Sequence, residues 1–156
     1  MKAFVVLSLC LFSFAFVPQG KIKLEVGVKL NRKYIPKKAT EQIATHPSQF
    51  RPFIKRTVDG VEYIIAYDEK NREIRYIHTT DKKFRTASGL RVGSEIPLKR
   101  EQLEVYPSWE IRAPITSDGW CPVVGVDLPI GYNLVGAFKV GETKMVTITG
   151  FSKGSN

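Results

Sequence analysis

The chain has 156 residues, of which 43% are hydrophobic, 11% aromatic and 25% charged. This composition excludes a disordered or low-complexity protein and predicts a compact domain with its own core. The 24 lysines and arginines exceed the 15 aspartates and glutamates, and the net charge of +9 favours acidic partners such as phosphate polymers, anionic lipid or a polyanionic wall. The basic residues are scattered along the chain, so an ordinary soluble basic surface is the alternative.

The first element is an apolar segment from Ala3 to Val17. It is shorter than the roughly 20 residues of a membrane span and has the pattern of a secretory signal peptide. We expect cleavage after Ala15, with Gly20 as the alternative, so that residues 1–15 are the signal peptide and residues 16–156 form a single domain. The mature protein is then expected to be secreted or periplasmic, without a transmembrane segment.

Apolar side chains alternate with polar ones or glycine after this segment, and the period of two predicts a half-buried strand; its apolar members are Ile22, Leu24, Val26 and Val28. Prolines interrupt the stretch from Asn31 to Phe53, which predicts irregular structure with one short helix at residues 39–44. Asp59-Gly60 is a turn signal.

A β-hairpin is predicted from Val61–Tyr67 and Ile74–Thr79, because both segments are rich in β-branched and aromatic residues and a polar loop separates them. We expect the two strands to pair through one face; the side chains assigned to that face are Val61, Tyr63, Ile65 and Tyr67 on the first strand and Ile74 and Tyr76 on the second.

The stretch from Thr79 to Gly93 is expected to be a structural junction. Asp81 can accept backbone hydrogen bonds where the strand ends, Phe84 can bury its ring, and Gly89 can supply the positive φ of a turn. The residues assigned to the junction are Asp81, Phe84, Thr86, Gly89, Leu90, Val92 and Gly93.

Ser94 can act as the N-cap of a helix, and Leu98–Tyr106 is the best helical segment of the chain, ended by Pro107. A second hairpin is predicted from residues 132–140 and 144–151. The resulting fold class is α+β, with antiparallel hairpins and one or two short helices.

An internal repeat is one interpretation of this order of elements, because Leu24-x-Val26-Gly27 recurs as Leu90-x-Val92-Gly93 and a hairpin follows each copy. The units would be residues 21–86 and 87–156, with Ile74 and Ile77 laid on Met145 and Ile148. The alternative is two unrelated hairpins in one domain.

The pattern T-x-D-x-x-F-x-T-x-x-G-L-x-V-G, from Thr79 to Gly93, resembles a motif of small exported bacterial proteins of unknown function. The order of elements is also similar to the tandem α/β units of the β-lactamase inhibitor protein and of SmpA-type envelope lipoproteins. Leu9 before Cys10 departs from the lipid attachment site of the latter. Neither resemblance implies a catalytic residue.

Local motifs for catalysis are missing, so an enzyme remains uncertain and we assign no catalytic, cofactor-binding or metal-binding residue. Cys121 lies among apolar residues and is expected to be a buried thiol. We expect a non-catalytic binding module of the cell envelope, an inhibitor or assembly accessory, or alternatively a basic module for an acidic polymer or anionic membrane surface. Specific nucleic-acid binding is not expected. Candidate partner-binding residues are Arg85, Arg91, Trp109 and Trp120.

Overall fold

The computed structural model of the chain describes residues 21–38, 41–46, 48–102, 104–105, 110–125 and 141–154. These residues form a nine-stranded sheet in which every strand pair is antiparallel. The strands are β1 (Gln42–His46), β2 (Gln49–Val58), β3 (Val61–Tyr67), β4 (Ile74–Thr79), β5 (Glu95–Lys99), β6 (Glu104–Val105), β7 (Ile111–Arg112), β8 (Cys121–Gly125) and β9 (Thr143–Gly154). Two short 3-10 turns, η1 (Arg32–Tyr34) and η2 (Arg100–Gln102), complete the described elements.

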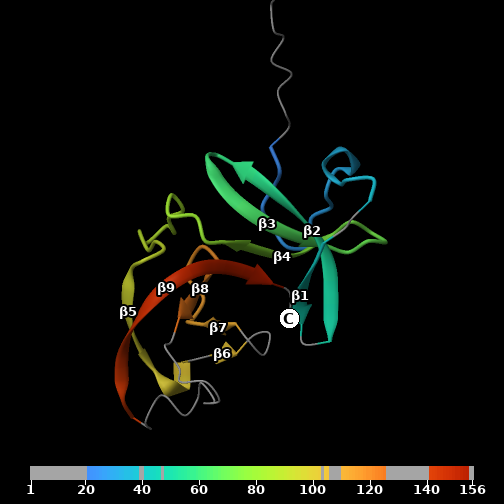
Figure 1. Cartoon of the computed structure of the whole chain (residues 1–156). Coiled ribbons are helices and arrows are strands. Elements are labelled where there is room, and N and C mark those ends of the chain that lie inside the picture. Colours follow the sequence, from blue (N-terminus) through green and yellow to red (C-terminus); the bar gives the residue numbers. More distant parts are fainter. Residues whose placement is uncertain are drawn as a thin grey trace, which may run out of the picture.

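The sheet order is β1-β2-β3-β4-β9-β8-β7-β6, and β5 pairs with β9 outside this path. Strand β9 is the long curved arrow in Figure 1 and connects the parts of the sheet. Its residues 143–147 pair with β5 and its residues 151–154 with β4, while β8 pairs along its other edge. The sheet therefore curls into a half-barrel around β9.

The α+β prediction is wrong, because the only helical elements among the described residues are η1 and η2. The segment expected to be a helix at 98–106 begins instead inside β5, where Leu98 is 3% exposed and lies opposite Lys144 of β9. Ser94 accepts a hydrogen bond from the Arg91 backbone in a turn, and it caps no helix. Helical propensity is a weak preference, and pairing with a distant strand overrides it here.

The segment up to Phe53 was predicted as irregular, but residues 49–53 are already part of β2. Residues 42–44 of the short helix expected at 39–44 are likewise strand, since β1 begins at Gln42; residues 39–40 lie outside the described residues. Strand β2 ends at Asp59-Gly60, where φ angles of 49° and 81° give the left-handed pair of a type I′ turn. The turn was recognised in the sequence; the strand before it was not.

The hairpin of β3 and β4 is confirmed, with Ile65 opposite Ile77 and Tyr67 opposite Ile74. A bulge beside Tyr67 shifts the register, so that Tyr76 lies opposite Ala66. Tyr76 is therefore not on the face of Tyr63 and Tyr67, where it was expected.

The leading segment, residues 21–30, alternates in burial as predicted, but it forms no strand. Its only strand-like contact among the described residues is a bridge between Lys29 and Glu73. The segment nonetheless packs apolar side chains against the core; these are Ile22, Leu24 and Val26.

Two matching sets of backbone hydrogen bonds connect each L-x-V-G segment to the last strand of its half. In each set the glycine donates to an isoleucine carbonyl, and that isoleucine donates to the carbonyl of the residue after the glycine. The distances are 2.8 and 2.9 Å in the first set and 2.7 and 2.8 Å in the second. The sets are Gly27, Ile74 and Val28, and Gly93, Ile148 and Ser94.

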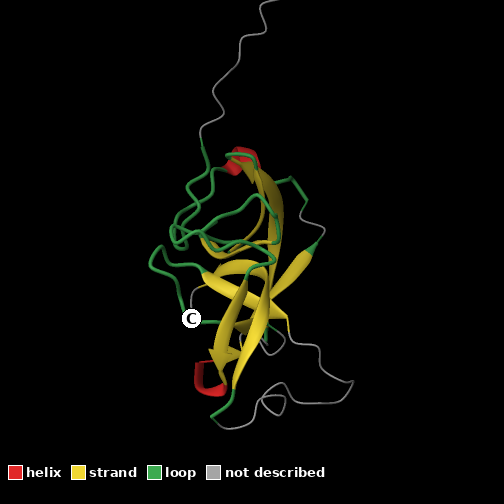
Figure 2. Cartoon of the chain, turned by 90° about the vertical axis from the view of Figure 1, so that its left-hand side faces the viewer, coloured by secondary structure: helices red, strands yellow, loops and turns green. Residues whose placement is uncertain are grey.

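The element order also repeats in part. Each half has a leading segment, a 3-10 turn and then four antiparallel strands, β1–β4 and β6–β9, and the two last strands, β4 and β9, pair with each other. The second half differs in that β5 precedes its 3-10 turn, where the first half has no strand. Figure 2 shows the turns η1 and η2 at opposite ends of the molecule. These correspondences support the predicted units, residues 21–86 and 87–156, as a proposal. They equate Ile74 with Ile148 and not with Met145, an offset of 148 − 74 = 74.

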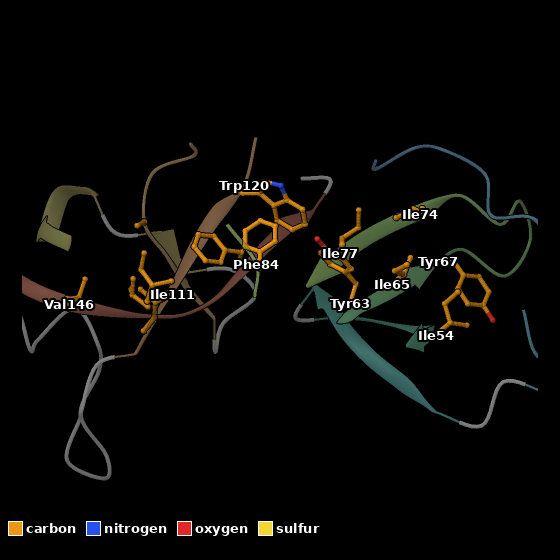
Figure 3. Close-up of a cluster of buried hydrophobic side chains, with 14 of the residues drawn as sticks. Ile54, Tyr63, Ile65, Tyr67, Ile74, Ile77, Phe84, Ile111, Trp120 and Val146 are labelled. Carbon is orange, nitrogen blue, oxygen red and sulfur yellow. The ribbon is translucent and has the colours of Figure 1, made fainter. Parts of the chain in front are cut away.

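The core runs along the inside of the curl, and Phe84 lies at its centre. Figure 3 shows Phe84 and Trp120 between Val146 and Ile111 on one side and the hairpin side chains on the other. Cys121 is buried as predicted. The signal peptide, the strand expected at 132–140 and Trp109 lie outside the described residues.

Candidate functional sites

Asp81 and Phe84 hold the beginning of the junction in place. The Asp81 carboxylate accepts hydrogen bonds from the Glu62 and Lys83 backbone amides, both at 2.9 Å, as expected for a strand end. Phe84 is 5% exposed and contacts Tyr63 of the first half at 6.2 Å between ring centroids. Its ring is also 4.8 Å from that of Phe151 in the second half, so Phe84 packs between the two halves.

The second half of the junction is a closed turn. The Thr86 hydroxyl accepts from the Leu90 amide at 3.0 Å, and the Gly89 amide donates to the Thr86 carbonyl at 2.9 Å. Gly89 has φ of 86°, the left-handed conformation expected for it. Leu90 and Val92 pack against the core, and Gly93 begins the contact with Ile148 described above.

Asp118 connects this turn to the loop before β8. Its carboxylate accepts from the Ala87 amide at 2.8 Å and from the Thr116 hydroxyl at 2.5 Å. Burial raises the pKa of Asp118, but these hydrogen bonds and the charge of Lys153 outweigh it and hold the pKa below its usual value. The junction is thus a structural joint between the halves.

Three of the four candidate partner-binding residues are among the described residues, and they differ in exposure. Arg85 and Arg91 are exposed, and the Arg85 guanidinium donates to the Lys82 and Phe84 carbonyls. Trp120 is only 7% exposed and packs on Phe84 at 4.8 Å. Trp120 therefore offers little surface to a partner.

A buried carboxylate, Glu110, lies on the other face of the sheet and was missed in the sequence. It is 2% exposed and accepts from the Tyr76 hydroxyl at 2.5 Å, from Arg112 Nε at 2.6 Å and from the Ser152 hydroxyl at 2.9 Å. Burial and the adjacent carboxylate raise the pKa of Tyr76 well above its usual value. The alternation of Glu110 and Arg112 with the apolar Ile111 and Ala113 was the sequence pattern from which this polar cluster could have been predicted.

His78 connects this cluster to the surface. Its Nδ1 is 4.0 Å from Glu110 Oε2, and its side chain is 17% exposed beside a hollow of about 290 Å³ that Glu62 and Asp81 also line. Burial lowers the pKa of His78; the Glu110 charge opposes the shift and Arg112 adds to it.

The chemistry available to this cluster is limited. Three donors occupy the Glu110 carboxylate. The Ser152 hydroxyl is fully buried and already donates to Glu110, so it is poorly placed to attack a substrate. A buried polar network of this kind fixes the packing of β4, β7 and β9. No group of three His, Cys, Asp or Glu side chains in the described ranges could hold a metal ion.

A basic face surrounds η1, at the opposite end of the molecule from η2. Three adjoining hollows of about 490, 350 and 1260 Å³ lie there, and Lys33 lines all three. The basic residues that line them are Lys21, Arg32, Lys33, Lys37, Lys55, Arg56, Lys70 and Arg72, and the acidic ones are Glu41, Asp59 and Glu69. We call these residues the basic face; its net charge is 8 − 3 = +5.

Most cations of the basic face are not neutralised. Lys21 pairs with Asp59 at 3.0 Å, and the Arg56 guanidinium donates to the Tyr34 and Lys55 carbonyls at 2.8 and 2.9 Å. The other six form no ion pair with a described residue. Arg56 thereby anchors η1 on β2 and keeps Lys33 at the centre of the face.

No local motif predicts this grouping, because its members come from residues 21–41, from β2 and the turn after it, and from the loop between β3 and β4. The clearest local signal was the charge of residues 21–39, which hold seven basic residues and one acidic residue.

No family model, curated protein or solved structure matches this chain. The described part of the chain contains no helix that is long and apolar enough to cross a membrane.

Proposed function

We propose that the protein is a non-catalytic binding module whose basic face takes an anionic partner. The observation that carries this proposal is the net charge of +5 around three adjoining hollows that share Lys33. A concave surface of one charge sign attracts and concentrates ligands of the opposite sign. The predicted location in the cell envelope, from the apolar segment at residues 3–17, is part of the proposal.

The two halves of the chain provide an internal comparison. Residues 21–39, which carry η1, have a net charge of 7 − 1 = +6. Residues 87–105, which carry η2 and lie 66 positions later, have three basic and three acidic residues and a net charge of zero. The lysines of residues 21–39 are therefore not needed for the backbone arrangement that both segments share. A role in binding would account for them.

The test measures binding of fluorescently labelled long-chain polyphosphate to the full chain by anisotropy, at low and high sodium chloride. Lys33→Glu with Lys55→Glu should abolish binding at low salt, and salt should weaken binding by the wild type steeply. Lys99→Glu with Lys83→Glu is the matched control, because it changes the net charge equally and both lysines lie outside the basic face. Equal loss in both double variants would show that only the total charge matters.

A further inference from the structure

We infer that the ligand of the basic face is a linear chain of phosphate groups that runs through the three hollows and passes Lys33. This inference rests on the function proposed above and specifies its ligand. A single small anion would need one closed site, whereas the basic face has three adjoining hollows. The Lys33 side chain lines each of them, so one chain can pass from hollow to hollow beside the same ammonium group.

The spread of unpaired cations favours a polymer. Lys55 lines the middle hollow with Arg56, and Lys37, Lys70 and Arg72 line the largest hollow, which lies at one end. Within the described part of the chain, two of the three hollows therefore hold unpaired basic groups of their own, and Lys33 is the unpaired cation of the third. Successive charges of one chain can engage successive hollows, which raises the affinity through effective concentration.

The kinds of cation are suited to phosphate groups. Five of the eight basic residues are lysines, which bind phosphate as point charges, whereas the fork of arginine matches carboxylate and phosphate alike. The fork of Arg56 is already occupied by the Tyr34 and Lys55 carbonyls. The concave surface also suits a chain better than a flat bilayer.

Arg72 is a specific element of the site. It lines the largest hollow with φ of 63°, a left-handed conformation that disfavours an arginine side chain. Glycine would suit this backbone better, so the guanidinium is retained at a conformational cost. A role of the Arg72 guanidinium in ligand binding would explain why an arginine stands at this unfavourable backbone position.

The experiment measures binding of the full-length protein to phosphates of increasing length: orthophosphate, tripolyphosphate and a polyphosphate of about 15 units. The affinity is expressed per phosphate group. We expect it to be about 100-fold higher for the long polyphosphate than for tripolyphosphate. The six cations that form neither an ion pair nor a carbonyl hydrogen bond with a described residue predict a slope of log affinity against log salt of roughly −4 for the long chain. Lys33→Glu should remove the length dependence. Arg72→Gly, which relieves the backbone, should make the slope shallower by about 0.7 without lowering the melting temperature.

The outcomes separate the two proposals. Equal affinity per phosphate at all lengths, lost in Lys33→Glu but not in Lys99→Glu, would overturn the extended ligand and leave the anion-binding function standing. Binding of no phosphate of any length would overturn both. Equal or tighter binding of poly-glutamate, or binding only to vesicles with phosphatidylglycerol as their anionic lipid, would overturn the phosphate chain in favour of a polycarboxylate or a membrane.

Discussion

His78 of β4 lies directly opposite Ser152 of β9 at the centre of the sheet. Both face Glu110, to which Ser152 donates a hydrogen bond and from which His78 is 4.0 Å distant. The two residues are 152 − 78 = 74 positions apart, the same offset as between Ile74 and Ile148, so the proposed repeat would make them equivalent. Polar contacts to one carboxylate join β4 and β9 at this point.

The two L-x-V-G glycines should respond alike to substitution. Gly27 and Gly93 have φ of 89° and 90°, and a Cβ atom at either position would meet nothing within 4 Å. Gly27→Ala and Gly93→Ala should therefore each cost about 1–2 kcal/mol through backbone strain alone, measured by urea unfolding. Gly150→Ala is a useful contrast, because its Cβ would lie 2.9 Å from the Thr79 carbonyl oxygen. Strongly unequal costs at Gly27 and Gly93 would argue against equivalent roles.

Removal of the Phe84 ring should destabilise the protein by about 3–5 kcal/mol, because Phe84→Ala leaves a cavity between the halves. The control is Arg91→Ala, an exposed site whose loss should stay within about 0.5 kcal/mol of the wild type. Thermal and urea unfolding of both variants checks this. A stable Phe84→Ala protein would mean that the halves do not depend on this ring.

Glu110→Gln should cost about 3–5 kcal/mol although the side chains have nearly the same shape, because the buried Arg112 loses its counter-charge. The exposed Glu101→Gln should leave the free energy of unfolding almost unchanged. A mild effect at Glu110 would indicate that its ion pair with Arg112 contributes little to the stability of the protein.

Protonation of His78 should make the protein less stable in mild acid. Burial holds the native pKa of His78 below its ordinary value of 6.5, so the unfolded chain takes up the proton at higher pH than the folded chain. The stability from neutral His78 is complete above about pH 6.5 and falls as the pH drops below it. His78→Gln should make the melting temperature depend less on pH in this range. The pKa values of Asp81 and Asp118 are lowered, so the stability that these two carboxylates contribute is lost only in a separate range, below pH 3.8.

Arg72→Gly should leave the free energy of unfolding unchanged or raise it by up to about 1 kcal/mol, since glycine accepts a φ of 63° without strain. Urea unfolding measures this directly, and Arg32→Gly in the helical turn η1 is the matched loss of one arginine. A destabilised Arg72→Gly protein would mean that the side chain stabilises the loop more than its backbone conformation costs.

The features predicted correctly from the sequence are those that depend on neighbouring residues. The β3–β4 hairpin and the Asp59-Gly60 and Gly89 turns follow from local composition and from the left-handed preference of glycine. The helix expected at 98–106 failed because its first residues complete an edge of β9 more than 40 positions later, since Leu98 pairs with Lys144.

The candidate sites depended still more on distant contacts. Lys33, Lys55 and Arg72 come together only because β2 and the β3–β4 loop fold beside η1. Glu110 gains its partners from β4 and β9. No local pattern contains these neighbours.

The central pairing of β4 with β9 also determines the order of assembly. Thr79 and Phe151 are partners separated by 151 − 79 = 72 residues, so this contact can form only after β9 has been synthesised, well after β4. Until then the strands of the first half can pair among themselves while β4 keeps an uncovered edge. We expect crowded chains to exchange their β9 strands when β9 has just been synthesised and the edge of β4 is still uncovered. The exchange would give a dimer that retains every contact of the monomer.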